Sequence, residues 1–229
     1  MNTGWWIADY WQAGETVLLA SWIIWVIVSI CLHELAHGWA AIWEGDDTPR
    51  ATGHMTWNPL VHMGGMSLVV FLLMGFAWGL MPVNPSRFRH HRWGDAIVAA
   101  AGPAMNLLLA FVLLTIAGVI AGLVLSAENP PEWGERAFTF FFTGGWLNLA
   151  LMVLNLLPMP PLDGSRILGS VSSGYRRLLM NPKAPLFGLA FFFLVFWMTP
   201  MGSIVVNVLQ GAAALWAGVV QGIVLRLAG

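Results

Sequence analysis

Residues 17–32 read VLLASWIIWVIVSICL and continue directly into HELAH at residues 33–37. An uncharged apolar stretch of this length predicts a transmembrane helix, which we expect over about residues 16–43. The helix then carries ionisable groups at membrane depth, where they are costly and usually functional. Residues four apart share one helix face, so His33 and His37 can hold one metal ion. Glu34 beside them can act as general base on a water activated by that metal.

The composition places the whole chain in a membrane. Of its 229 residues, 58% are hydrophobic and only 9% are charged, with a mean hydropathy of +0.73. Soluble domains carry about 25% charged residues. The net charge of −1 argues against a nucleic-acid partner. The single cysteine, Cys31, excludes an internal disulfide and leaves the redox compartment open.

The apolar stretches predict an all-α polytopic membrane protein with about five to six transmembrane helices. We see no repeat or linker, so we expect one integral-membrane domain over residues 1–229. The last stretch is broken by Thr199-Pro200-Met201-Gly202 and should form two helices. The core helices are expected at about 16–43, 95–125 and 136–157, and the additional helices at about 184–199 and 203–227.

One apolar stretch, residues 66–81, is too short for a span of at least about 17 residues. It contains Gly75 and Gly79, and turn-like residues lie on both sides at 64–65 and 82–85. We therefore predict a re-entrant segment around residues 53–85. Backbone of this kind persists at membrane depth only against protein or a water-filled cavity.

The basic residues indicate the orientation of the chain. One loop carries arginines at 87, 89 and 92, another carries basic residues from 166 to 183, and the loop 126–135 carries three acids and no base. The positive-inside rule makes both basic loops cytoplasmic. Helix 95–125 then runs outward and helix 136–157 runs inward, in a multi-pass protein of the cytoplasmic membrane.

A third metal ligand is expected after the inward helix. Two histidines leave a catalytic zinc one protein ligand short, and two histidines with a carboxylate form a known set. Asp163 is the best candidate, although it can also cap the helix 164–171 that follows it. His33 lies about 24 Å along its helix from Val17, so His33 and Asp163 can meet if both helices run inward. The sequence thus predicts one zinc ion per chain near the cytoplasmic face.

These residues resemble the site-2 protease family of intramembrane zinc metalloproteases. The segment 33–37 matches its H-E-x-x-H motif, and residues 155–164, NLLPMPPLDG, match N-x-x-P-x-P-x-x-D-G. Residues 53–59 and 101–106 also resemble segments of compact bacterial members without a PDZ domain. The likeness covers roughly residues 15–170, and the departure is Ser165, where many members have a second glycine.

The resemblance implies zinc bound by His33, His37 and Asp163, with Glu34 as catalytic acid and base. It also implies a core of three helices and, as substrates, transmembrane segments of single-span membrane proteins, cut in regulated intramembrane proteolysis. By resemblance Asn155 is a substrate contact. Asn106 is open between substrate contact and packing.

Two other functions stay open. The same site could transport metal ions through the membrane, or the chain could be a non-proteolytic relative that only binds membrane proteins. Glu34 distinguishes a metal-ion transporter from a protease, because transport needs no general base. The substrate, the cleavage position, the regulator and the oligomeric state are not encoded in any pattern that we recognise.

Several other residues have simpler interpretations. We expect His54 and His62 to be interfacial rather than ligands, and His90 and His91 to belong to a solvated loop. The pair at 144–145, Gly-Gly, permits close helix packing. Asn148 is expected to form a hydrogen bond between helices.

Overall fold

The computed structural model describes residues 4–228, without the side chains at positions 92 and 197, and this part of the chain contains helices and no strand. The all-α architecture predicted from the sequence is confirmed. The elements are, in order, α1 (Trp6–Gln12), α2 (Thr16–Trp43), α3 (Thr48–Ala51), α4 (Pro59–Met74), η1 (Pro85–Arg87), α5 (His91–Ile120), η2 (Ala121–Leu125), α6 (Glu132–Asn155), α7 (Asp163–Val171), α8 (Ser173–Leu179), α9 (Ala184–Met198) and α10 (Met201–Ala228).

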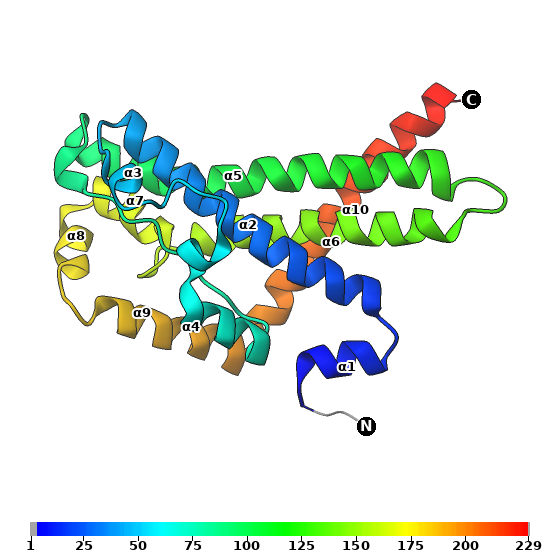
Figure 1. Ribbon diagram of the computed structural model, residues 1–229, viewed down its shortest axis with the longest axis horizontal. Coiled ribbons are helices and arrows are strands. Elements are labelled where there is room, and N and C mark those ends of the chain that lie inside the picture. The colour runs from blue at the N-terminus through cyan, green and yellow to red at the C-terminus, as the bar shows by residue number, and fades with distance from the viewer. Residues whose placement is uncertain (1–3, 229) are drawn as a thin grey trace.

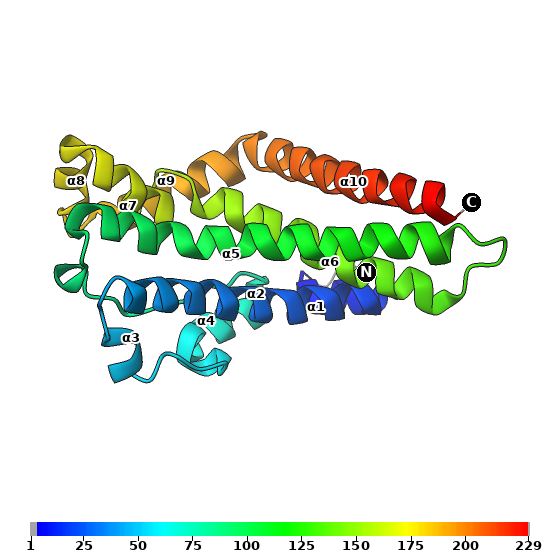
Figure 2. The same cartoon turned by 90° about the horizontal axis from the view of Figure 1, so that it is seen from above.

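Helices α2, α5 and α6 lie side by side and form the centre of the molecule (Figures 1 and 2). α2 and α6 run in one direction and α5 runs in the other. Glycines allow the close approach, since a Cβ on Gly144 would lie 2.5 Å from the Trp25 indole and a Cβ on Gly145 would lie 2.5 Å from Leu114. The two glycines therefore serve packing, as the sequence indicated.

Four helical segments are long and apolar enough to cross a membrane: Thr16–Trp43, Trp93–Leu125, Glu132–Asn155 and Met201–Ala228. A fifth crossing requires the pair Ser173–Leu179 and Ala184–Phe196, which is bent by 97°. α9 has 15 residues, about 22 Å of helix, which is short of an apolar core of about 30 Å. The chain is a multi-pass membrane protein, and a count of five to six spans stays a prediction.

α4 has the broken geometry expected of a short apolar helix between turns. It begins after Asn58, whose side chain accepts from the Leu60 N–H, it kinks at Gly64 with φ 67°, and it ends at Gly75 with φ 73°. Only glycine adopts such a left-handed conformation at little cost. Residues 76–84, which we call the extended segment, then follow without helical structure.

The extended segment folds back along α4. The Ser67 hydroxyl accepts from the Trp78 N–H at 2.9 Å and donates to the Trp78 carbonyl at 2.7 Å. The Leu80 N–H donates to the carbonyl of His62 at 2.9 Å. One edge of the segment is thereby bonded to α4.

Two buried acids that follow α2, Glu44 and Asp46, bind the chain between the extended segment and α5. Both are fully buried, and Glu44 accepts from the His90 backbone at 3.1 Å and lies 2.9 Å from its ring Nδ1. Burial alone raises the pKa of Glu44, but the hydrogen bonds from His90 outweigh burial and hold that pKa below its usual value. Asp46 accepts from the Asn84 N–H at 2.6 Å.

The contact between Glu44 and His90 means that the chain leaves α2 and enters α5 at the same end of the bundle (Figure 1). A segment whose two ends lie on the same side of the membrane makes no net crossing of it. That is the connectivity that a re-entrant segment requires, and its depth in the membrane stays a prediction.

The N-terminal tryptophans have a structural role that the sequence did not indicate. The indole N–H groups of Trp5 and Trp6 both donate to the carbonyl of Leu72, at 2.8 and 3.2 Å. The Trp6 ring also packs on Phe71, with centroids 5.7 Å apart. α1 therefore satisfies an end carbonyl of α4 just before the extended segment begins.

Candidate metal centre

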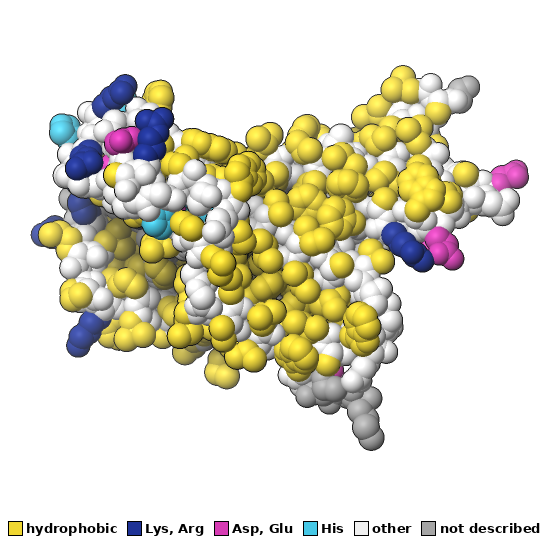
Figure 3. Space-filling view, in the orientation of Figure 1, with side chains coloured by type: hydrophobic (Ala, Val, Ile, Leu, Met, Phe, Trp, Pro, Cys, Tyr) yellow, Lys and Arg dark blue, Asp and Glu magenta, His cyan; other side chains and the backbone are white. Residues whose placement is uncertain are grey.

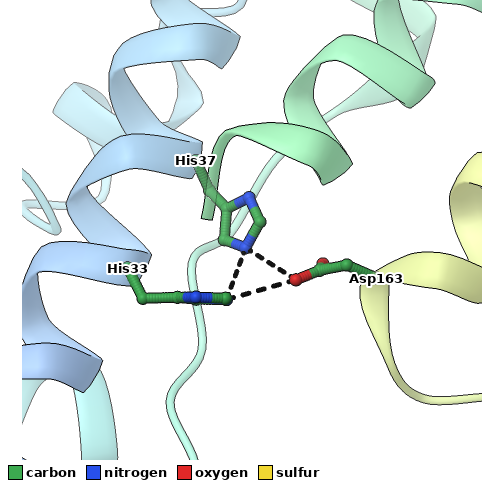
Figure 4. Close-up of side chains that lie close together, drawn as sticks. All are labelled: His33, His37 and Asp163. Atoms are coloured by element: carbon green, nitrogen blue, oxygen red, sulfur yellow. Dashed lines mark hydrogen bonds and ion pairs between the residues drawn. The ribbon is translucent and has the colours of Figure 1, made fainter. Parts of the chain in front are cut away.

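Three ionisable side chains from two distant parts of the chain converge inside the bundle (Figure 4). His33 and His37 come from adjacent turns of α2, and Asp163 is the first residue of α7. All three are buried, with 5–8% of each residue exposed. Among the described residues this is the group of His, Cys, Asp and Glu that can hold a metal ion.

The three potential ligand atoms form a nearly equilateral triangle. His33 Nε2 lies 3.0 Å from His37 Nε2, and Asp163 Oδ2 lies 3.1 and 3.2 Å from the two nitrogens. Donors held about 2.0–2.1 Å from zinc at tetrahedral angles lie about 3.3 Å apart. The triangle therefore has the size that one zinc ion needs.

Hydrogen bonds on the opposite ring atoms leave both Nε2 atoms suited to bind a cation. His37 Nδ1 donates to the carbonyl of Val98 at 2.7 Å, and His33 Nδ1 lies 2.5 Å from Asn106 Oδ1. A neutral imidazole with its proton on Nδ1 presents a lone pair on Nε2. Two lone pairs and a carboxylate oxygen would repel one another at about 3 Å, so a cation fits among them.

Asp163 is positioned by the start of α7. α7 is fixed to α5 by Arg166, whose Nε and Nη2 both donate to Asp95 Oδ1, at 3.2 and 2.7 Å. Ser165, the departure from the family pattern, is accommodated, because its hydroxyl donates to the Leu162 carbonyl at 2.7 Å.

Gly102 of α5 leaves room for the two imidazoles. A Cβ at this position would lie 2.5 Å from His33 Nε2 and 2.5 Å from His37 Nε2. Real Cβ atoms do not approach other atoms so closely, so only glycine fits the observed ring positions. Gly102 belongs to the family-like segment 101–106, but the sequence pattern assigned it no role, although it lies four residues before Asn106 and therefore on the same helix face.

Glu34 lies beside the triangle and is 7% exposed. Its carboxylate has no hydrogen-bond partner among the residues that the structure describes, so its oxygens remain available for water. The backbone of Gly79 in the extended segment lies against it, since a Cβ there would lie 2.6 Å from Glu34 Cγ. The site thus combines a cation-binding triangle with a free carboxylate, beside an extended stretch of backbone.

The other candidate residues lie in different surroundings. Asn155, at the end of α6, is half-buried and donates to the Leu151 carbonyl at 3.0 Å. Asn106 is fully buried, and both of its polar atoms are bonded within the protein. Contact of either residue with a substrate stays a prediction.

His62 is enclosed by the protein, and its place at the membrane interface stays a prediction. Its residue is 1% exposed, because the kink at Gly64 and the extended segment enclose it, and its Nε2 lies 2.6 Å from the Thr56 carbonyl. The metal-binding group found among the described residues consists of His33, His37 and Asp163.

The fold and the site together define a multi-pass membrane metalloprotein whose donor set is that of hydrolytic zinc sites. The sequence profile of peptidase family M50 matches residues 21–131 and 117–199. The chain belongs to this family, which confirms the resemblance to site-2 proteases.

Curated relatives support the assignment. One, "Putative zinc metalloprotease YwhC" of Bacillus subtilis, is 37% identical over 188 residues, which cover 80% of this chain and 82% of that protein. Rip2 of Mycobacterium tuberculosis, which has the same description, is 31% identical over 170 residues, covering 67% of this chain and 61% of Rip2. No solved structure matches the chain. The protein is therefore a membrane metallopeptidase with zinc as its metal.

Proposed function

We propose that this protein is an intramembrane zinc endopeptidase that cleaves transmembrane segments of single-span membrane proteins, as in regulated intramembrane proteolysis. The observation that carries the proposal is the His33–His37–Asp163 triangle beside the unbonded carboxylate of Glu34. All four groups lie toward one end of a bundle whose helices are long and apolar enough to span a membrane.

The chemistry follows from the roles that these groups can take. When bound, zinc supplies Lewis acidity, which activates a water molecule and the scissile carbonyl. His33, His37 and Asp163 hold the metal and leave room for water and substrate. Glu34 accepts the proton of the attacking water on a carboxylate oxygen and transfers it to the nitrogen of the leaving amine.

The extended segment is the proposed docking place for the substrate. The carbonyls of a helix are hydrogen-bonded, so a substrate helix must unwind locally before water can attack it. The backbone N–H and C=O groups of Ala77 and Gly79 have no partner among the described residues, whereas those of Trp78 are bonded to α4. An unwound peptide can therefore add along this free edge, beside Glu34. Asn155 would contact the substrate from the end of α6.

We further propose that the protein lies in the cytoplasmic membrane with its site near the cytoplasmic face. Most Lys and Arg side chains gather at the end of the molecule that also carries α7 and α8, and the middle is covered by hydrophobic side chains (Figure 3). This distribution is typical of the cytoplasmic end of a membrane protein. Arg177→Cys and Glu128→Cys, each in a Cys31→Ser background, test the orientation. An impermeant thiol reagent applied to intact cells should label position 128 and not position 177, and the reverse pattern would contradict the proposal.

Glu34→Gln tests the function. The change keeps the size of the side chain and removes the base, so zinc content should stay at one ion per chain. Cleavage should fall by at least about 10²-fold, the low end of general acid–base contributions. The assay is cleavage of a panel of single-span membrane proteins in reconstituted vesicles, with zinc measured on the same samples. Glu128→Gln, an exposed acid in the loop after η2, is the matched control. Cleavage by Glu34→Gln at near the wild-type rate would reject this mechanism and favour metal transport.

A further inference from the structure

We propose that Asn106 and Asn148, the asparagine pair, are positioning residues that fix the tautomer of His33 and thereby its affinity for zinc. The proposal rests on the zinc site proposed above. It assigns to Asn106 a role toward a metal ligand rather than toward a substrate.

The asparagine pair belongs to a chain of hydrogen bonds that begins and ends on α2 and passes through α5 and α6. Asn106 of α5 lies 2.5 Å from His33 Nδ1 of α2, and its Nδ2 donates to Asn148 Oδ1 of α6 at 2.9 Å. Asn148 Nδ2 donates to the hydroxyl of Ser29 at 2.8 Å, and Ser29 lies on α2 one turn before His33. Asn106, Asn148 and Ser29 are all fully buried, so water does not compete for these bonds.

One backbone carbonyl fixes the direction of the hydrogen bonds in this chain. Asn148 Nδ2 also donates to the carbonyl of Gly144 at 2.8 Å, and a carbonyl can only accept. Asn148 must therefore present its amide oxygen to Asn106. Asn106 must in turn present its NH2 group to Asn148 and its oxygen to His33. With an acceptor at 2.5 Å, His33 Nδ1 carries the proton and Nε2 is free for the metal.

The two histidines differ in how firmly their surroundings hold the ring proton on Nδ1. His37 Nδ1 donates to the backbone carbonyl of Val98, which cannot rotate. A side-chain amide can turn by 180°, and a turned Asn106 would offer an N–H to His33 Nδ1. The proton of His33 would then move to Nε2 and block the ligand position. Asn148 prevents this, because the turned amide would place two oxygens against each other.

The first experiment measures zinc affinity by chelator competition on purified protein in detergent, independently of proteolysis. Asn106→Leu removes the acceptor at similar size and should weaken zinc binding by about 10–100-fold, the usual effect of losing a partner of a metal ligand. Asn106→Asp keeps an acceptor toward His33 and loses only the donor toward Asn148. It should bind zinc at least about tenfold more tightly than Asn106→Leu, although its melting temperature should also fall.

Two further variants separate positioning from packing. Ser29→Ala removes one buried hydrogen bond of Asn148 but leaves the Gly144 carbonyl, so zinc affinity should not change while thermal stability falls. Asn148→Leu frees the Asn106 amide without altering the group at His33, and should weaken zinc binding by at least about threefold. This variant also tests the proposal if Asn106→Leu does not fold.

The outcomes are distinct. Wild-type zinc affinity in Asn106→Leu or Asn148→Leu, with only the melting temperature lowered, would show that the asparagine pair serves packing and would overturn the inference alone. Equal loss of zinc in Asn106→Asp and Asn106→Leu would also overturn it. Absence of zinc binding by the wild-type protein would overturn both this inference and the proposed function.

Discussion

Adding one methyl group at Gly102 should remove the metal although no ligand residue is replaced. In Gly102→Ala, the new Cβ would lie 2.5 Å from His33 Nε2 and from His37 Nε2, whereas ordinary contacts begin at 3.4 Å. The rings or α5 must therefore move by about 0.9 Å, the difference between these two distances. Metal sites tolerate ligand displacements of about 0.2 Å. Zinc affinity should fall by at least about 100-fold, beyond the usual loss for a neighbouring group.

The fold should survive this change. Alanine is favoured over glycine inside a helix by about 0.5–1 kcal/mol, and overpacking a buried site costs about 1–3 kcal/mol. The net loss of about 0–2.5 kcal/mol lowers the melting temperature by no more than about 10 °C in a chain of this size. The protein should purify folded, without zinc and without cleavage activity.

Two alanine variants are matched controls for Gly102→Ala. A Cβ on Gly145 would also lie 2.5 Å from a neighbour, but that neighbour is Leu114 and not a ligand. Gly145→Ala should therefore lose stability and keep its zinc. Around Gly218 of α10 no atom lies within 4 Å of the Cβ position, so Gly218→Ala should keep both. One zinc per chain and wild-type cleavage in Gly102→Ala would refute the ring positions on which this reasoning depends.

Three further changes test neighbouring parts of the structure. Gly79→Ala should leave zinc bound but lower cleavage by at least about tenfold in the vesicle assay, because its Cβ would displace the Glu34 carboxylate; an unchanged rate would contradict this packing. Asp163→Asn should lose most of its zinc in elemental analysis, because a neutral amide is a poor ligand, and full zinc content would remove Asp163 from the site. Glu44→Gln should melt about 3–10 °C below wild type at pH 7. Since the pKa of Glu44 is lowered by folding, its stabilising contribution is present above the ordinary carboxyl pKa of 4.5 and is lost as pH falls through the lowered value. A difference in melting temperature that does not shrink as pH falls below 4.5 would be inconsistent with this.

The sequence was most informative where one local pattern determines the outcome. The apolar stretch before His33 predicted a helix over 16–43, and α2 spans Thr16–Trp43. The spacing of His33 and His37 on that helix placed both rings on one face, and they lie 3.0 Å apart at Nε2. Asp163 required a longer argument from the direction of two helices. Asp163 could nevertheless be predicted as a ligand, because the basic loops indicate the direction in which each helix runs.

Contacts between distant helices were harder to predict. The sequence left Asn106 open between substrate and packing, because nothing local shows that Asn148, 42 residues later, would take its NH2 group. The burial of His62 was not predicted for the same reason, since it depends on a kink at Gly64 and on the later extended segment. The number of spans also depends on how α8 and α9 bend, which length and hydropathy do not determine.

The histidine ligands lie on α2, but the groups that orient them lie on α5. The motif on α2 alone therefore does not predict the contacts between the two helices. α2 provides two ligands and the candidate base, but an apolar membrane helix has few other polar groups with which to orient them. α5 supplies this orientation from a single face: Val98 accepts from His37, Gly102 leaves space for both rings, and Asn106 accepts from His33. These three residues are spaced by four and contribute a carbonyl, a missing side chain and an amide. Only one of the three is a polar side chain. A search for further functional residues in this chain should therefore follow the face of the packed helix and include its glycines, because a small residue that touches a ligand controls metal geometry as directly as a polar one.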